Sequence, residues 1–183
     1  MFRVFYEMKH IQDLDRPDNP HVERMLLVAS PSSAIFSSYD RILQGQRTQQ
    51  QLEAHSAMYK GTISPPLMVQ GLRDVSPFDL YFFASEQKFF VLENLIVNYL
   101  YEEKYPTINW EIQEETKTIQ GISCQKAVAQ YKGRQWQVWF TDQIPIPFGP
   151  WELGGLPGLI VEASDAREEV VFSFDGFETI DQG

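Results

Sequence analysis

Short runs in which apolar and polar residues alternate dominate the first hundred positions. Residues 2–8 alternate imperfectly in this way, and the apolar runs 23–29 and 34–38 have the length of strands. Residues 78–101 form the most apolar stretch, which Glu86-Gln87-Lys88 interrupts. The interruption favours two paired strands over one helix, so this half of the chain predicts an antiparallel sheet.

The pattern becomes clearer in the last eighty residues. Lys132-Gly133 is typical of a tight hairpin turn, and Ser164-Asp165-Ala166-Arg167 predicts a second hairpin. Along the run that follows Gly133, Trp136 and Trp139 fall on opposite faces of a strand. The strand-like runs of this region are 116–122, 125–131, 135–141, 159–163 and 170–174.

One stretch has a different composition. Residues 41–60 are rich in Gln, Arg, Leu, Ala and Glu and poor in β-branched residues, which predicts a helix. Gly61 follows its end, where a left-handed cap is favoured. Residues 13–20 and 61–77 are rich in proline and predict loops. The fold class predicted is α+β: a single domain over 1–183, mainly a curved antiparallel sheet with one or two helices packed on it.

Composition narrows the function classes. The chain has 25 acidic and 15 basic side chains, a net charge of −10, which argues against a binder of nucleic acid. No apolar run reaches the roughly 18 residues of a membrane span, so we expect no transmembrane segment. The N-terminus lacks the pattern of a signal peptide. With one cysteine, Cys124, no internal disulfide is possible.

Histidine, cysteine and metal chemistry find little support. His10, His21 and His55 lie in the first third of the chain, and no G-x-S-x-G elbow accompanies them. We interpret them as packing or surface residues. Two groups could present imidazole and carboxylate ligands to a metal: His10 with Asp13 and Asp15, and His21 with Glu23. Neither group has the i, i+4 spacing of a helical zinc motif, so we favour a solvated acidic loop and expect neither a metal nor a cofactor. Cys124 is predicted to be a small buried hydrophobe.

Carboxylates offer one catalytic alternative. Adjacent pairs such as Glu102-Glu103 point to opposite faces of a strand and cannot share a proton. Asp142 and Glu152 flank an aromatic segment and are the best candidates for hydrolysis, which requires two carboxylates to converge.

Aromatic side chains supply the candidate ligand-binding residues. Aromatics favour binding clefts, although they are also frequent in cores. The strands of 78–101 and 135–141 are unusually rich in them. The candidate binding residues are Trp136, Trp139, Trp151, Phe82 and Phe89.

A segment rich in proline and glycine spans residues 144–160. Its X-Pro steps favour extended backbone, and its glycines allow a close backbone approach. It lacks the basic residue of a phosphate-binding loop. We predict a rigid connection that places Leu156, Leu159 and Ile160 in the core.

The same segment carries a resemblance to a known family. Residues Gly155, Leu156, Pro157, Gly158, Leu159 and Ile160 spell the hexapeptide that names the GLPGLI family of cell-envelope proteins from Bacteroidota. Other short motifs follow the order found in that family, most clearly over residues 105–163. They are Ile108 to Ile112, Glu115 to Ile119, Cys124 to Ala127, Gly133-Arg134, Trp139 to Thr141, Ile144 to Ile146 and Gly149-Pro150.

The resemblance implies location and fold more than activity. It implies an exported protein, periplasmic or associated with the outer membrane, whose signal has been removed and which lacks a C-terminal strand or is a short variant. Members look similar to the open half-barrel of periplasmic lipoprotein carriers. The resemblance carries no catalytic set.

Three functions follow as hypotheses. The first is a non-enzymatic envelope protein that binds an apolar ligand, such as an acyl chain or an apolar peptide. The second is a module that docks on another envelope protein through an exposed strand edge. The third is a hydrolase that uses Asp142 or Glu152. The oligomeric state stays open.

Overall fold

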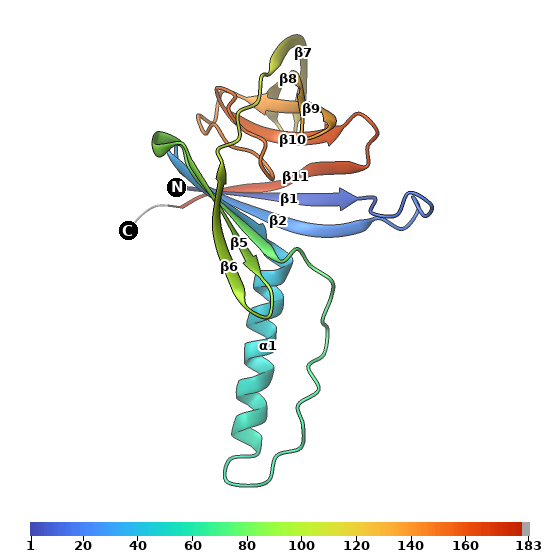
Figure 1. Ribbon diagram of the computed structural model, residues 1–183, viewed down its shortest axis with the longest axis vertical. Helices are drawn as coiled ribbons and strands as arrows, with labels where there is room; N and C mark the ends of the chain where they lie inside the picture. The colour runs from blue at the N-terminus through green and yellow to red at the C-terminus, as the bar shows by residue number, and fades with distance from the viewer. Residues whose placement is uncertain (181–183) are drawn as a thin grey trace.

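A computed structural model describes residues 1–180 and contains one large antiparallel sheet with one α-helix (Figure 1). The strands follow the order β6-β5-β4-β3-β2-β1-β11-β10-β9-β8-β7. Their bounds are β1 Phe2–His10, β2 His21–Ala29, β3 Ser33–Ser38, β4 Phe78–Phe83, β5 Lys88–Asn94, β6 Asn98–Lys104, β7 Glu111–Ile119, β8 Ile122–Tyr131, β9 Arg134–Thr141, β10 Leu159–Asp165 and β11 Val170–Thr179; helix α1 is Tyr39–Met58, and a short 3-10 turn is Ala84–Glu86.

The sheet consists of two meanders that meet in its middle. Strands that are consecutive in the chain pair with each other, except β6 and β7, and β1 pairs with β11 as well as with β2. The first strand and the last strand therefore lie at the centre, and β6 and β7 form the two edges. The predominantly antiparallel sheet that the alternation predicted is confirmed.

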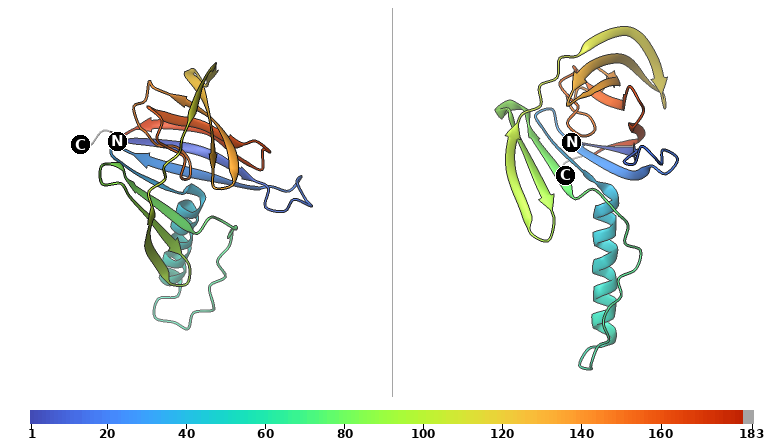
Figure 2. Two further views of the ribbon diagram at one scale, coloured as in Figure 1. Left: turned by 45° about the horizontal axis from the view of Figure 1, so that its top comes forward. Right: turned by 45° about the vertical axis from the view of Figure 1, so that its right-hand side comes forward.

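The connection between the two edges forces the sheet to curve. Eleven strands laid flat would place β6 and β7 roughly 48 Å apart, at about 4.8 Å for each of the ten spacings. Residues 105–110 join these edges, and an extended segment of that length spans at most about 25 Å. The sheet must therefore bend toward itself, and Figure 2 shows the two halves facing each other across a concave side.

The core fills this concave side. Strand residues with the period of two that a half-buried sheet requires point inward, and aromatic side chains meet there. Phe82 and Phe89 stack with ring centroids 4.9 Å apart, and Phe82 also lies 5.9 Å from Phe148. The largest fully buried apolar side chains are Trp136, Tyr6, Phe36, Phe89, Met25, Leu27, Ile146, Leu153, Leu159, Ile160 and Val4.

Residues 142–158, here called the crossing segment, lie inside the concavity between β9 and β10. Its Ile146 and Leu153 are buried. Backbone hydrogen bonds join the crossing segment to β10: Ile160 N donates to Phe148 O over 3.1 Å, and Leu159 N donates to Ile144 O over 3.0 Å. Tyr6 Oη on β1 donates to Ile160 O over 2.7 Å. The crossing segment therefore occupies the concave side with the protein's own side chains. Leu156, Leu159 and Ile160 are buried in the core, as predicted.

Helix α1 differs from the prediction in its placement. Ser38 caps it, since Ser38 Oγ accepts a hydrogen bond from Arg41 N over 2.9 Å. It meets the sheet only at its base, where Arg24 pairs with Asp40 and Arg41 pairs with Asp79. The helix has no buried residue and projects away from the sheet instead of packing on it (Figure 1).

The helix and the segment that returns from it form a stalk, residues 39–77. The two arms are joined mainly by polar contacts: Gln51 Nε2 donates to Gln70 O over 3.3 Å, and Gln51 Oε1 accepts from Gln70 N over 3.1 Å. Gln44 Oε1 accepts from Arg73 N over 2.8 Å. Within residues 1–180, no helix is both long enough and apolar enough to cross a membrane.

The region 78–104 holds three strands where two were predicted. Gln87 adopts a left-handed conformation and closes the first turn, as the polar interruption suggested. The second turn consists of Leu95, Ile96 and Val97, which are apolar and exposed. An apolar turn looks like the continuation of a strand, so the pattern concealed the boundary between β5 and β6.

Cys124 supports a prediction about reactivity. It is buried on β8, and burial raises the pKa of its thiol to about 11. Because only the thiolate is nucleophilic, we expect the folded protein at pH 8 to react with a thiol reagent at least about a hundredfold more slowly than the protein in urea. Timed iodoacetamide labelling followed by mass spectrometry measures both rates. Equal rates would contradict the burial.

Candidate ligand-binding site

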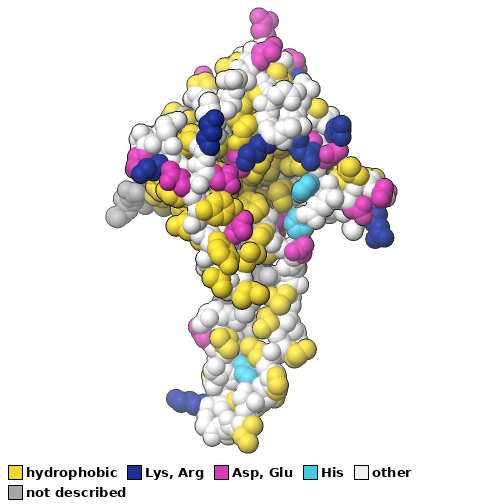
Figure 3. Space-filling model, in the orientation of Figure 1, with side chains coloured by type: hydrophobic (Ala, Val, Ile, Leu, Met, Phe, Trp, Pro, Cys, Tyr) yellow, Lys and Arg dark blue, Asp and Glu magenta, His cyan; other side chains and the backbone are white. Residues whose placement is uncertain are grey.

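A cavity of about 530 Å³ opens at one end of the concave side, where β1 ends and β2 and β11 begin. Its size lies in the usual range of small-molecule sites, roughly 300–1,000 Å³. In Figure 3 this region is an apolar hollow bordered by basic side chains, with two histidines at its edge. The apolar lining is Met8, Val75, Pro77, Phe78, Trp136, Trp151, Val170 and Phe172, and the polar lining is His10, Gln12, His21, Asp74, Ser76, Lys132 and Arg134.

The floor of the cavity is the polar end of two core-facing rows. On β1, His10 continues the inward row that Tyr6 and Met8 occupy. On β2, His21 and Glu23 continue the inward row of Met25. The register pairs His10 with His21 and Met8 with Glu23. The inward rows of these two strands are therefore mostly apolar and end in ionisable side chains where they reach the cavity.

Glu23 is the polar anchor of this floor. Its side chain is 1% exposed, and its carboxylate accepts three hydrogen bonds. Ser76 N donates to Oε1 over 2.9 Å, Ser76 Oγ donates to Oε2 over 2.7 Å, and His21 Nε2 lies 2.9 Å from Oε2. A buried charge is tolerated when it is paired in this way. The contacts join strand β2 to the segment that precedes β4.

His10 stays neutral at pH 7. Burial lowers the pKa of its imidazole, and the neighbouring Arg134 guanidinium lowers the pKa further, against the opposing charges of Asp165 and Glu169. His10 thus presents a neutral ring to the cavity, with one donor and one acceptor nitrogen.

Two tryptophans form the wall opposite the floor. The ring centroids of Trp151 and Trp136 lie 5.6 Å apart, and those of Trp151 and Tyr131 lie 5.8 Å apart. Trp151 has a φ of +55°, which is rare for a bulky residue. A turn holds it there, since Leu153 N donates to Pro150 O over 3.1 Å. Such backbone strain is concentrated at functional sites, and here it directs an indole toward the cavity.

The basic groups at the cavity are already paired. Lys132 Nζ lies 2.7 Å from the buried Glu152, which also accepts a hydrogen bond from Tyr131 Oη over 2.6 Å. Burial, together with this bond to Glu152, raises the pKa of Tyr131. Arg134 Nη1 lies 2.5 Å from Asp165 and 2.6 Å from Glu169. The rim is therefore polar but offers no unpaired cation of its own.

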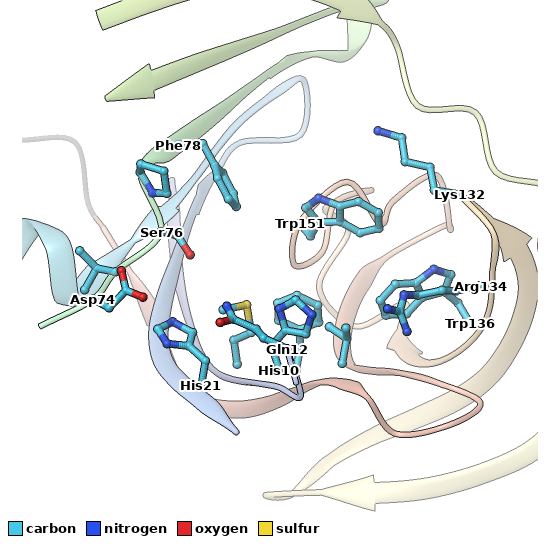
Figure 4. Close-up of a pocket in the computed structure, with 15 residues that line it drawn as sticks. His10, Gln12, His21, Asp74, Ser76, Phe78, Lys132, Arg134, Trp136 and Trp151 are labelled. Atoms are coloured by element: carbon cyan, nitrogen blue, oxygen red, sulfur yellow. The ribbon is translucent and has the colours of Figure 1, made fainter. Parts of the chain in front are cut away.

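The structure brings together some of the aromatic residues that the sequence singled out. Trp136 and Trp151 line the cavity (Figure 4). Trp139 lies on the other face of β9, with Lys117 Nζ 4.6 Å from its ring centroid. Phe82 and Phe89 stack in the core and do not line this cavity.

The two candidate catalytic carboxylates do not converge. Asp142 is exposed and lines a different surface depression, next to β7 and β8. Both oxygens of Glu152 are occupied by Tyr131 and Lys132. The geometry therefore gives no support to a hydrolase that uses this pair.

Sequence reasoning missed the polar floor. It interpreted His10 and His21 as packing or surface residues, and it considered Glu23 only as the partner of His21 in a metal site that it rejected. The sequence did contain one indication. His10, His21 and Glu23 each lie an even number of residues from the apolar positions that face the core, so all three side chains belong to the inward face of their strands. In residues 1–180, no group of three or more His, Cys, Asp or Glu side chains is arranged to hold a metal ion.

One family model matches part of the chain. A family model described as "N-glycanase peptide, N-terminal domain" matches residues 93–173, which is less than half of the chain. This region contains the part of the chain from β6 to the start of β11, including Trp136 and Trp151. No curated protein matches the chain.

Solved structures extend the likeness to nearly the whole fold. Two structures described as PNGF-II, in space groups P21 and C2, superpose with TM-scores of 0.68 and 0.67 at 12% and 11% sequence identity. Each match covers 98% of this chain but 28% of the longer chain. At this identity the likeness establishes a shared fold, and this chain spans little more than a quarter of the length of those proteins.

These findings correct one expectation and leave another untouched. The chain was expected to be non-enzymatic, and this is contradicted, because the family model and the structural neighbours are all named for a glycanase. The resemblance to the GLPGLI family stays a prediction.

Proposed function

We propose that the chain is a saccharide-binding domain of a glycan-processing enzyme and that the cavity holds one or two sugar rings. The partly exposed indole of Trp151, which packs on the buried Trp136 beside a polar floor, is the observation that carries the proposal. The negative face of an aromatic ring attracts the C–H face of a sugar, while the floor supplies hydrogen bonds to hydroxyls. The match to the N-terminal domain of an N-glycanase supports the same ligand class.

The charges around the cavity favour a neutral ligand. Lys132 is paired with Glu152, and Arg134 with Asp165 and Glu169. A ligand carboxylate would have to compete with these existing partners for its cation. A neutral polyhydroxyl compound needs no such exchange.

An apolar ligand is the second candidate. Met8, Phe78 and Phe172 give the cavity an apolar lining that suits an acyl chain or an apolar peptide. A likeness to the half-barrel lipoprotein carriers would place such a ligand against the concave side. The crossing segment, however, already fills most of that side. The remaining cavity lies at one end and leaves little length for an extended chain.

A docking role is favoured by one edge of the sheet. Strand β6 is an unpaired edge whose Tyr99, Leu100 and Tyr101 are exposed. The charges of β6 are confined to its end, at 102–104, whereas the other edge, β7, bears Glu114, Glu115 and Lys117 in its middle, which discourage edge pairing. An extended segment of an envelope protein could add to β6 by strand addition. This function would be compatible with an occupied cavity.

A binding measurement separates these candidates. We expect N,N′-diacetylchitobiose, the disaccharide through which N-glycans are attached, to bind the intact chain in an isothermal titration. Trp151→Gly removes the indole and relieves the φ of +55°, and we expect it to weaken binding at least about tenfold. Trp139→Ala is the matched control, because that tryptophan lies on the opposite face, and it should leave affinity unchanged.

Three outcomes would argue against the saccharide proposal. Absence of chitobiose binding would contradict it, and so would equal losses in Trp151→Gly and Trp139→Ala. If dodecanoate binds instead of the sugar, and Trp151→Gly weakens that binding, the cavity is a site for an acyl ligand.

A further inference from the structure

The contacts of Glu23 determine where His21 carries its proton. Ser76 N and Ser76 Oγ both donate to this carboxylate, and the third neighbour is His21 Nε2 at 2.9 Å. An ionised carboxylate only accepts hydrogen bonds, so Nε2 must be the protonated nitrogen of His21. In the neutral imidazole, Nδ1 then has a free lone pair. No hydrogen bond to Nδ1 is formed by any residue of the described range 1–180.

The free edge of His21 belongs to the cavity. Its side chain is 16% exposed and lines the cavity together with His10, Asp74 and Ser76. In Figure 4, His21, Ser76 and Asp74 lie on one side of the cavity, and Trp136, Arg134 and Lys132 lie on the opposite side. A ligand between them meets the indoles on one side and the imidazole on the other.

We propose that His21, held by Glu23 and Ser76, is the specificity-determining acceptor of the site, and that it selects a ligand with a hydroxyl donor. This rests on the proposed saccharide function and makes it more specific. The ligand hydroxyl donates to Nδ1, while Glu23 prevents the ring from rotating or changing tautomer. An acyl chain has no donor along its length and leaves Nδ1 unpaired in a partly buried site, which costs binding energy.

The neighbouring groups reinforce this selectivity. Asp74 is a second acceptor at the same side of the cavity. The guanidinium of Arg73 is directed to the backbone, since Nη2 lies 3.5 Å from Val22 O. Two acceptors facing one side match a pair of adjacent hydroxyls, such as those of a sugar ring. A site built to bond a hydroxyl discriminates strongly against the analogue that lacks it.

Two substitutions of His21 separate its nitrogens. In His21→Gln the side-chain amide nitrogen reaches the position of Nε2 and keeps the donor to Glu23, but the acceptor at Nδ1 is lost. In His21→Asn the shorter amide places its oxygen near the position of Nδ1, but the donor to Glu23 is lost. His55→Gln, on the stalk, is the matched control for a histidine outside the cavity.

The experiment measures chitobiose affinity by calorimetry and the tautomer by NMR of the intact chain labelled with ¹⁵N-histidine. We expect His21 of the unliganded protein to carry its proton on Nε2. We expect His21→Gln to weaken binding at least about tenfold without a change in melting temperature, and His55→Gln to have no effect. His21→Asn should retain more affinity than His21→Gln. Deoxy analogues of chitobiose identify the hydroxyl that donates to Nδ1. Loss of that hydroxyl should weaken binding to the wild type but should not weaken binding to His21→Gln further.

Specific results would overturn the proposal. A proton on Nδ1 of His21 would do so in the unliganded protein, before any ligand is added. Wild-type affinity in His21→Gln, with binding still lost in Trp151→Gly, would remove the role of His21 and leave the saccharide site intact. Unchanged affinity in Trp151→Gly, or no binding of chitobiose to the wild type, would remove both.

Discussion

Gly158→Ala is expected to lower the free energy of unfolding by about 3 kcal/mol or more. A Cβ at this position would lie 1.9 Å from Thr141 O, 2.7 Å from Thr141 C and 2.9 Å from Asp142 Cα. All three are backbone atoms: two belong to Thr141, the last residue of β9 and the partner of Leu159, and the third belongs to Asp142, which follows it. No side chain can rotate away to make room, so the crossing segment and the strand must separate.

Gly155→Ala is the control within the same hexapeptide. Gly155 has a φ of +86°, but no atom lies within 4 Å of a Cβ built there. Only the left-handed backbone is penalised, so we expect a loss of about 1–2 kcal/mol. Urea denaturation of the two variants and the wild type measures the difference. A loss in Gly158→Ala no larger than that in Gly155→Ala would show that β9 and the crossing segment are not in close contact.

Arg134→Met is expected to be the second large loss, about 3 kcal/mol. Arg134 pairs with Asp165 and Glu169, and the side chain of Asp165 is only 3% exposed. Removing the guanidinium leaves two carboxylates close together, one of them buried without its counter-ion. The Asp165 carboxylate would retain the hydrogen bond from Val170 N, at 3.0 Å.

Arg3→Met tests whether burial of the carboxylate is the reason for the large loss of stability in Arg134→Met. Arg3 and Glu178 lie 3.7 Å apart, and both side chains are about half exposed. Pairs of this kind contribute about 0–1 kcal/mol, because water screens them. Urea denaturation of both variants and the wild type at pH 7 gives the comparison. Equal losses in Arg3→Met and Arg134→Met would contradict the proposed cost of an unpaired buried carboxylate.

The strands were largely predictable because each has one buried face and one exposed face. The alternation in residues 2–8 and the Lys132-Gly133 turn follow from local chemistry, and they appear in β1 and in the turn between β8 and β9. Helix α1 was found in the composition, but its placement was not predictable. The helix is joined to its return segment by glutamine side chains, and polar contacts leave no apolar stripe that would indicate a neighbour.

The site was only half predictable for a related reason. Trp136 and Trp151 stand out by residue type, and the prolines around Trp151 suggested a rigid segment. The polar floor depends on register, because His10 faces His21 only when β1 and β2 pair as they do. When the strand register is not known, the sequence shows only three histidines at unrelated positions. The phase of Glu23 within its strand was visible, but a single charged residue in an apolar run is usually exposed.

The stalk divides the chain into regions that should open on different timescales. Its helix has no buried residue, so separating its two arms sacrifices few apolar contacts. Local opening free energies follow buried contacts, and we infer that amides of residues 42–72 exchange with solvent long before those of β1 and β11. A protease at low concentration should therefore cut first in the stalk and leave a nicked protein whose sheet and cavity remain assembled. The same region is then the natural place to insert a tag or a fluorophore for following the cavity without disturbing it.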